Sequence, residues 1–138
     1  MTIKEILQYD RTMKAIVDNS KNVNALIKFK LLGMCKQFEP IIINFQTIRN
    51  EKITEYGTED ESGGISIALP QRDNFESDDE YNNALNEYEE TMAKFNEELD
   101  QILDSEADIT IKKFKVSDIM ESGISSNYLV GIYDLIEE

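Results

Sequence analysis

Histidine is absent from this sequence of 138 residues, and cysteine occurs only once, as Cys35. The absence of histidine excludes Ser–His and Cys–His nucleophile pairs and removes the commonest side-chain ligand of transition metals. A single cysteine excludes an internal disulfide and a metal site built from several cysteines. Cys35 lies beside a predicted core position with only Lys36 as a basic neighbour, so we expect a buried, inert thiol.

Long apolar runs are also missing, and none approaches the ~18 residues that a membrane-spanning helix needs. The N-terminal stretch contains Glu5 and Asp10 and lacks a small-residue cleavage site, so we do not expect a signal peptide. The length predicts a single domain over residues 1–138, long enough to bury a core. We expect the protein to stay in the cytoplasm where it is made or to enter an assembled particle.

Positive charge is scarce, because 14 Lys and Arg stand against 28 Asp and Glu, for a net charge of −14. Residues 1–53 carry nine basic and five acidic side chains, whereas residues 54–138 carry five and twenty-three. An acidic surface repels nucleic acid and anionic membranes, so neither is expected as a direct partner. Three interpretations stay open: a solvated acidic face, a surface that meets a basic partner or imitates a nucleic-acid backbone, and head-to-tail contact between two copies.

The N-terminal part predicts a short amphipathic helix over 2–18, within an N-terminal segment of 1–19. Thr2 and Glu5 have the spacing of a capping box. The Asn- and Ser-rich stretch 18–24 should break the helix, because these side chains bond their own backbone.

The strongest periodic signal is an apolar stripe that steps alternately by four and three residues, which is typical of a helix packed lengthwise on another. We expect one helix over 22–57, kinked at Pro40, in preference to two helices with a break there. Gly57 is placed to end it in the left-handed conformation. The members of this first stripe are Ile27, Leu31, Met34, Phe38, Ile41, Phe45 and Ile48.

A second stripe has the same steps and the same length, on a helix predicted over 77–104 that begins with a Ser77–Glu80 capping box. Two matched stripes would bury one another if the chain doubled back between them, so we predict a long antiparallel helical hairpin. The members of the second stripe are Tyr81, Leu85, Tyr88, Met92, Phe95, Leu99 and Ile102.

The remaining segments predict minor elements. Residues 58–64 should form an exposed loop and residues 65–69 a strand stopped by Pro70. An extended segment over 107–119 could pair with that strand as a two-stranded ribbon, with a bulge or strand end at Lys112–Lys113. Together with a terminal helix at about 126–136, this completes the segment 107–138. The apolar face of that helix would consist of Leu129, Ile132, Tyr133 and Ile136.

No group of residues carries a catalytic, cofactor-binding or metal signature, so we predict none of these sites and no cofactor. The acidic stretches 58–64 and 73–80 do not match the calcium-loop pattern. The two members of each pair, Glu89–Glu90 and Glu97–Glu98, point about 100° apart on a helix, and nothing supplies the desolvated pocket that would separate their pKa values. We therefore expect these carboxylates on exposed helix faces and not in acid–base catalysis. The basic stretch 112–115 is expected to pair with surrounding acids.

Three runs resemble a family of short, uncharacterised proteins encoded by tailed bacteriophages and prophages: "IKFKLLGMCKQFEPIIINFQTIRNEKITEYGTEDESGGISI", "EYNNALNEYEETMAKFNEELDQILDSEADITIKKFKVSDI" and "SSNYLVGIYDLIEE". The resemblance covers about residues 20–138 and implies a phage origin and a helical hairpin, but no activity. Pro40 and the polar insert 71–80 depart from the family pattern. The matching places are Tyr56–Gly57, Glu61–Ser62–Gly63, Glu97 to Ile111 and Tyr128 to Glu138.

We therefore expect a mainly α fold: a long antiparallel helical hairpin, short N- and C-terminal helices and a minor two-stranded β ribbon. The expected function is that of a non-enzymatic bacteriophage protein acting by protein–protein contact, as a virion structural or assembly component that associates with itself or with other phage proteins. The alternative is an acidic phage inhibitor of a host protein, as an anti-defence factor or nucleic-acid mimic. An enzyme that uses carboxylates and a metal is a third class.

Overall fold

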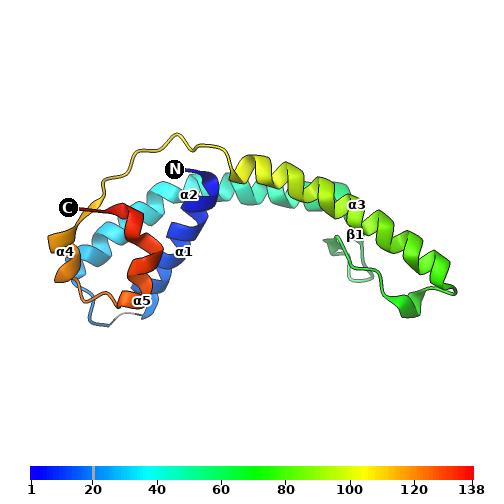
Figure 1. Ribbon diagram of the computed structural model, residues 1–138, viewed down its shortest axis with the longest axis horizontal. Coiled ribbons are helices and arrows are strands. Elements are labelled where there is room, and N and C mark those ends of the chain that lie inside the picture. The colour runs from blue at the N-terminus through cyan, green and yellow to red at the C-terminus, as the bar shows by residue number, and fades with distance from the viewer. Residues whose placement is uncertain (20) are drawn as a thin grey trace. The chain divides into compact units, whose positions relative to one another are not determined.

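A computed structural model describes residues 1–19 and 21–138, which form two compact units (Figure 1). Unit 1 comprises Met1–Ile43 and Asp104–Glu138, and unit 2 comprises Asn44–Leu103. The protein is mainly helical, as the sequence predicted, and none of the helices within the described residues could cross a membrane. Its helices are α1 (Ile3–Asn19), α2 (Ala25–Tyr56), α3 (Asp78–Leu103), α4 (Val116–Met120) and α5 (Ser126–Leu129), with 3₁₀ helices η1 (Arg72–Asn74) and η2 (Val130–Leu135).

Helix α1 begins at the predicted capping box. The Thr2 N–H donates to Oε2 of Glu5 at 2.7 Å, and the Glu5 N–H donates to Oγ1 of Thr2 at 3.2 Å. These reciprocal bonds satisfy two of the donors that a helix N-terminus leaves open. The break predicted over 18–24 is confirmed for the described residues, since α1 ends at Asn19 and α2 begins at Ala25; Ser20 lies outside them. The Asn24 side chain caps α2 by accepting from the Leu26 N–H at 2.8 Å.

Helix α2 continues through Pro40, so the prediction of one helix is confirmed, whereas the kink stays a prediction. The prediction for Gly57 is wrong, because the described residues with a positive φ are Gly63 and Gly123. Gly57 is instead needed because the backbones of Ile53 and Ser66 lie too close to it to leave room for a side chain. A Cβ there would lie 2.5 Å from the Ile53 carbonyl oxygen and 2.9 Å from that of Ser66.

The first half of the first apolar stripe is buried in the core of unit 1. Ile27, Leu31, Met34 and Phe38 are buried in one cluster with side chains of α1 and of the C-terminal segment. Pairing of the two stripes along their whole length is therefore not confirmed, because α1 and the chain end cover these positions. The other buried apolar members are Ile6, Tyr9, Met13, Ile16, Val23, Ile42, Phe114, Ile119, Ile132 and Leu135.

Unit 2 contains a short antiparallel ribbon between β1 (Thr58–Glu59) and β2 (Ile65–Ser66). Its turn is closed by Asp60, whose Oδ1 accepts from the N–H groups of Ser62 and Gly64 at 2.9 and 3.0 Å. A minor two-stranded ribbon was predicted, but its predicted pairing of 65–69 with 107–119 is wrong. Local closure wins because a short loop loses less entropy than a long one.

The C-terminal segment of unit 1 differs from the sequence prediction in two places. The extended segment stops early, since β3 (Phe114–Lys115) pairs in parallel with β4 (Ile136–Glu137) and α4 follows β3 directly. The single helix predicted over 126–136 is wrong, because α5 gives way to η2 and then to β4. The segment η2 is interrupted by a kink at Ile132 (φ −125°, ψ 15°), and Ile132 and Leu135 are both buried in the unit 1 core. Tyr133, predicted on the apolar face, is exposed.

Candidate functional site

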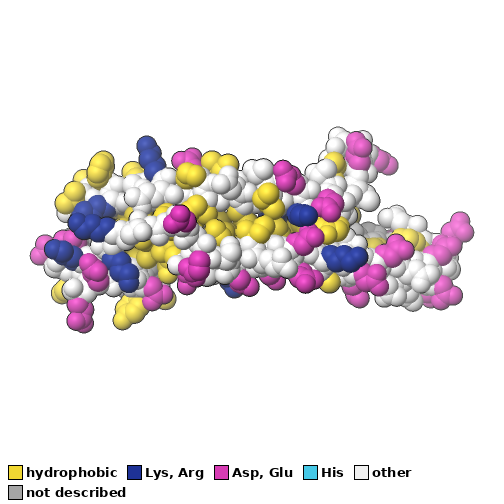
Figure 2. Space-filling model, turned by 90° about the horizontal axis from the view of Figure 1, so that it is seen from above, with side chains coloured by type: hydrophobic (Ala, Val, Ile, Leu, Met, Phe, Trp, Pro, Cys, Tyr) yellow, Lys and Arg dark blue, Asp and Glu magenta, His cyan; other side chains and the backbone are white. Residues whose placement is uncertain are grey.

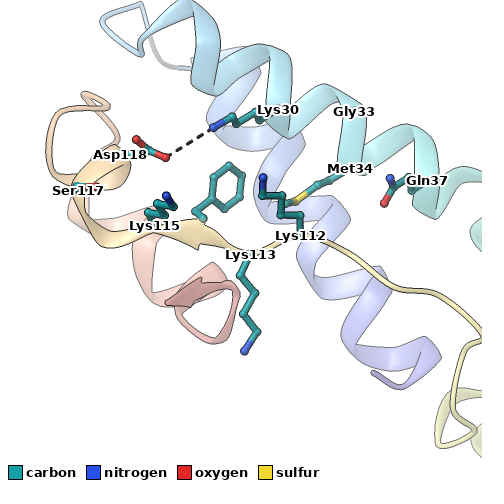
Figure 3. A pocket seen from close by; sticks show the side chains of 10 residues that line it. Lys30, Gly33, Met34, Gln37, Lys112, Lys113, Lys115, Ser117 and Asp118 are labelled. Atoms are coloured by element: carbon teal, nitrogen blue, oxygen red, sulfur yellow. Dashed lines mark ion pairs between the residues drawn. The ribbon is translucent and has the colours of Figure 1, made fainter. Parts of the chain in front are cut away.

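A groove lies in unit 1 between α2 and the segment that carries β3 and α4 (Figure 3). Its cavity volume is about 480 Å³. Helix α2 forms one wall of the groove. Its buried stripe fixes which side of the helix faces the core, and the residues beside that stripe line the groove. We call this hollow the lysine groove; it is lined by Lys30, Gly33, Met34, Gln37, Lys112, Lys113, Phe114, Lys115, Ser117 and Asp118.

The lysine groove combines apolar residues with charged ones. Met34 and Phe114 are buried members of the unit 1 core, and they contribute the apolar part of the lining. The Lys112 side chain points toward α2, whereas that of Lys113 points the opposite way (Figure 3). Lys30 lies 3.6 Å from Asp118, an ion pair between two exposed side chains that contributes little to stability.

The groove is positively charged in a protein that is strongly acidic. Four lysines line it and Asp118 is its one acidic residue. Among the described residues, Lys112 and Lys115 form no ion pair. Such a site can bind carboxylates or other anionic groups, because the ammonium groups of Lys112 and Lys115 form no ion pair among the described residues and lie beside apolar atoms of Met34 and Phe114.

An exposed apolar stripe lies beside the groove on α2. Leu26, Phe29 and Leu32 are 61%, 74% and 47% exposed. Lys30 follows Leu26 by four residues, and Gly33 follows Phe29 by four. Side chains at this spacing are neighbours on a helix, so the exposed stripe and the groove form one continuous surface. We call Leu26, Phe29 and Leu32 the outer stripe.

Cys35 lies near a buried carboxylate in unit 1. The Asp10 carboxylate is buried and its Oδ2 is 2.8 Å from the Lys14 ammonium; within the described part of the chain its Oδ1 has no hydrogen-bond partner. Burial raises the pKa of the Cys35 thiol to about 11, and the Asp10 carboxylate adds to this rise. The prediction of a buried thiol is wrong, because Cys35 is only half-buried. That the thiol is inert stays a prediction, which the raised pKa favours.

The acidic residues considered from the sequence have structural contacts or are exposed. Glu98 accepts from the Tyr56 hydroxyl at 2.9 Å and lies 3.2 Å from the Lys52 ammonium. The Tyr56 hydrogen bond, followed by Lys52, lowers the pKa of Glu98. Its neighbour Glu97 and the pair Glu89–Glu90 are exposed. No group of three side chains that could hold a metal occurs within the described residues.

The acidic stretches 58–64 and 73–80 are largely exposed. The hydrogen bond from the Ser62 hydroxyl, followed by that from the Gly64 N–H, lowers the pKa of Asp60. Asp78 is 2.8 Å from Arg72, and the Ser77 hydroxyl accepts from the Glu80 N–H at 3.2 Å, as its capping role predicts. Both stretches therefore have local structural roles as well as exposed charge.

A comparison of the chain with protein-family models, with curated proteins and with solved structures finds no match in any of the three. What the lysine groove could bind is therefore inferred from its residues and their arrangement alone. Sequence reasoning noted the basic stretch 112–115 but did not connect it with α2. Lys30, Gly33 and Gln37 recur at helical spacing beside the buried stripe, and this spacing is the sequence signal that marks the other wall.

Proposed function

We propose that this chain is a non-enzymatic bacteriophage protein that acts by contact with other proteins, as a structural or assembly component of the virion. The outer stripe is the observation that carries the contact function. Three large apolar side chains exposed together on one helix face favour a surface that another protein covers. The phage origin and the place in the virion depend on the sequence resemblance.

We further propose that unit 2 is an antiparallel helical hairpin, formed by the second part of α2 and by α3. Glu98 of α3 contacts both Lys52 and Tyr56 near the end of α2, which supports side-by-side packing of these two helices. Figure 2 shows that Asp and Glu are the predominant charged side chains on the visible face of this unit. Unit 2 has sixteen acidic and four basic side chains, whereas unit 1 has twelve and ten.

The test is mass spectrometry of purified virions from cells that produce the protein. We expect the wild-type chain in the particles at a fixed ratio to known structural proteins. The variant Phe29→Ser should be depleted from particles, because it removes the most exposed large side chain of the outer stripe. Val130→Ser is the matched control, since Val130 is exposed and apolar but lies outside the stripe. Absence of the wild-type chain from purified particles would refute the virion role.

The acidity of unit 2 favours a second candidate function, inhibition of a host protein that binds nucleic acid. In that case the tagged protein should retain a basic host protein, and retention should weaken steeply as salt is raised. A virion component held through the outer stripe should depend much less on salt, because apolar contact is not screened. Retention that is insensitive to salt would count against the inhibitor function.

A further inference from the structure

We propose that the lysine groove binds the acidic segment 73–80 of a second copy of this chain. This inference rests on the proposed contact function and names one of its partners. It assigns a role to the groove that the outer stripe alone does not supply. It also makes the contact head-to-tail, because a groove on unit 1 of one copy would hold a segment of unit 2 of the next.

The groove has the chemistry to bind an acidic peptide segment. Lys112 points toward α2 and approaches the groove from the side opposite Lys30 (Figure 3). Carboxylates that enter between these two lysines would find positive charge on both sides and apolar atoms of Met34 and Phe114 nearby. The cavity of about 480 Å³ is large enough for several acidic side chains but not for a folded element.

The segment 73–80 has the complementary chemistry. Five of its eight residues are acidic, none is basic, and all five acidic side chains are exposed. It precedes and begins α3, so its first half is not constrained by a long helix. Phe75 is half-buried with its ring centroid 5.8 Å from that of Tyr81, which ties the segment to unit 2. The acidic residues are Asp73, Glu76, Asp78, Asp79 and Glu80.

Charge favours a second copy as the occupant. Unit 2 carries a net charge of −12 and unit 1 only −2, so a second copy's unit 2 is repelled less by unit 1 than by another unit 2. The attraction is local, because the lysine groove of unit 1 concentrates positive charge where the acidic segment 73–80 would enter. Contact between unlike patches is heterologous, and it continues into rings or filaments where it does not close on itself. Such repetition suits a component of an assembled particle.

The experiment is a charge swap in the full chain, followed by sedimentation velocity over a range of concentrations. One variant reverses the groove (Lys112→Glu with Lys115→Glu), and the other reverses the segment (Asp73→Lys with Glu76→Lys). Each variant alone should associate at least about tenfold more weakly than the wild type, because like charges then meet. An equal mixture should recover wild-type affinity, since each altered surface meets its complement on the other variant.

Lys4→Glu compared with Lys112→Glu is the matched control, because Lys4 is an exposed lysine of unit 1 that does not line the groove. Only Lys112→Glu should weaken association. A mixture that does not recover, equal effects of the two single variants, or a wild-type chain that stays monomeric at all soluble concentrations would each overturn the inference. In these cases the proposed contact function is judged separately by the particle analysis of Phe29→Ser. If the wild-type chain is absent from purified particles but the mixture of charge-swap variants recovers wild-type affinity, the virion role is refuted and this inference stands.

Discussion

Unit 1 and unit 2 stabilise their chain segments in different ways. Within the described residues, unit 1 buries fourteen apolar side chains in one cluster, whereas unit 2 buries Phe95 and Leu99. Unit 2 depends more on local features: the Asp60 turn, the Ser77 cap and the contacts of Glu98. The difference predicts that opening of unit 2 requires less free energy than global unfolding of unit 1.

This difference suits the two proposed roles. A binding groove and an apolar stripe need a rigid support. The core of unit 1 provides it, because it holds the buried face of α2 and so fixes the position of the groove and of the outer stripe on the same helix. A segment that enters a groove on another copy needs exposed charge, and 73–80 in unit 2 carries five exposed acidic side chains. The comparison can be tested by perturbing equivalent features in the two units.

The largest effect should come from core truncation. Phe38→Ala removes a ring that is 0% exposed within the unit 1 cluster and should lower the free energy of unfolding by about 3–5 kcal/mol. Phe95→Ala removes a 7% exposed ring in unit 2, where fewer buried neighbours surround the site, and should cost about 1–3 kcal/mol. Urea denaturation of both variants gives the two values.

Hydrogen exchange on the same variants locates the damage. Phe95→Ala should speed amide exchange within 44–103 and leave α1 protected, whereas Phe38→Ala should speed exchange throughout unit 1. Equal costs with global loss of protection in both variants would contradict the distinction between the units.

The next effect concerns glycine. Gly57→Ala in unit 2 should destabilise the β1–β2 ribbon by about 1–3 kcal/mol, because the added Cβ would meet the backbone oxygens of Ile53 and Ser66. Gly33→Ala in unit 1 is the control of opposite sign. Its Cβ would meet nothing within 4 Å, so replacing a helical glycine should stabilise by about 0.5–1 kcal/mol. Thermal denaturation of both variants measures the difference, and equal signs would refute it.

The sequence predicted the parts of the fold that local chemistry decides. The capping box at Thr2, the cap at Ser77 and the length of α3 follow from side-chain type and spacing, because a cap and its helix lie within a few residues. The prediction of one helix across Pro40 also holds, since the apolar period is unbroken there.

The sequence could not decide which apolar surfaces meet. The stripe from Ile27 to Phe38 has a heptad spacing that suits any long partner, and in the structure it packs in one core with side chains of α1 and of the C-terminal segment. The strand partners predicted for β2 and β3 were also wrong. Strand pairing depends on which segments lie nearby in space, and the sequence pattern does not decide this. The lysine groove was missed because Lys30 and Lys112 are far apart in sequence.

A smaller effect follows from the titration of Cys35 in unit 1. Its pKa is raised from 9.0 to about 11 by burial and by Asp10, so the folded state keeps the thiol proton when the unfolded state has lost it. The stabilising contribution is complete below about pH 9 and is lost as pH rises through about 11. At pH 8 the folded chain should have roughly a hundredfold less thiolate than an unperturbed thiol, and alkylation by iodoacetamide should be slower to match.

The pH profile of alkylation identifies the cause. Its midpoint should lie near 11 in the wild type. Asp10→Asn should lower that midpoint, because the negative charge raises the pKa, and Lys14→Gln should raise it, because the ammonium lowers the pKa. A wild-type midpoint near 9, or shifts of the same sign in both variants, would contradict this account.

The smallest effect should appear at the opposite end of the pH scale, in unit 2. The Tyr56 hydrogen bond, followed by Lys52, depresses the pKa of Glu98 below its ordinary value of 4.5. A depressed carboxyl pKa stabilises the folded state above the unfolded value, and this contribution is lost as pH falls through the folded value. NMR of the Tyr56 ring should therefore show a transition below pH 4.5 while the α1 amides of unit 1 stay unchanged. Glu98→Gln should abolish the transition, because the amide does not titrate, whereas Glu97→Gln should leave it intact because Glu97 is exposed. If the transition persists in Glu98→Gln, another carboxylate causes it. The titration of Glu98 would then not contribute to the stability of unit 2.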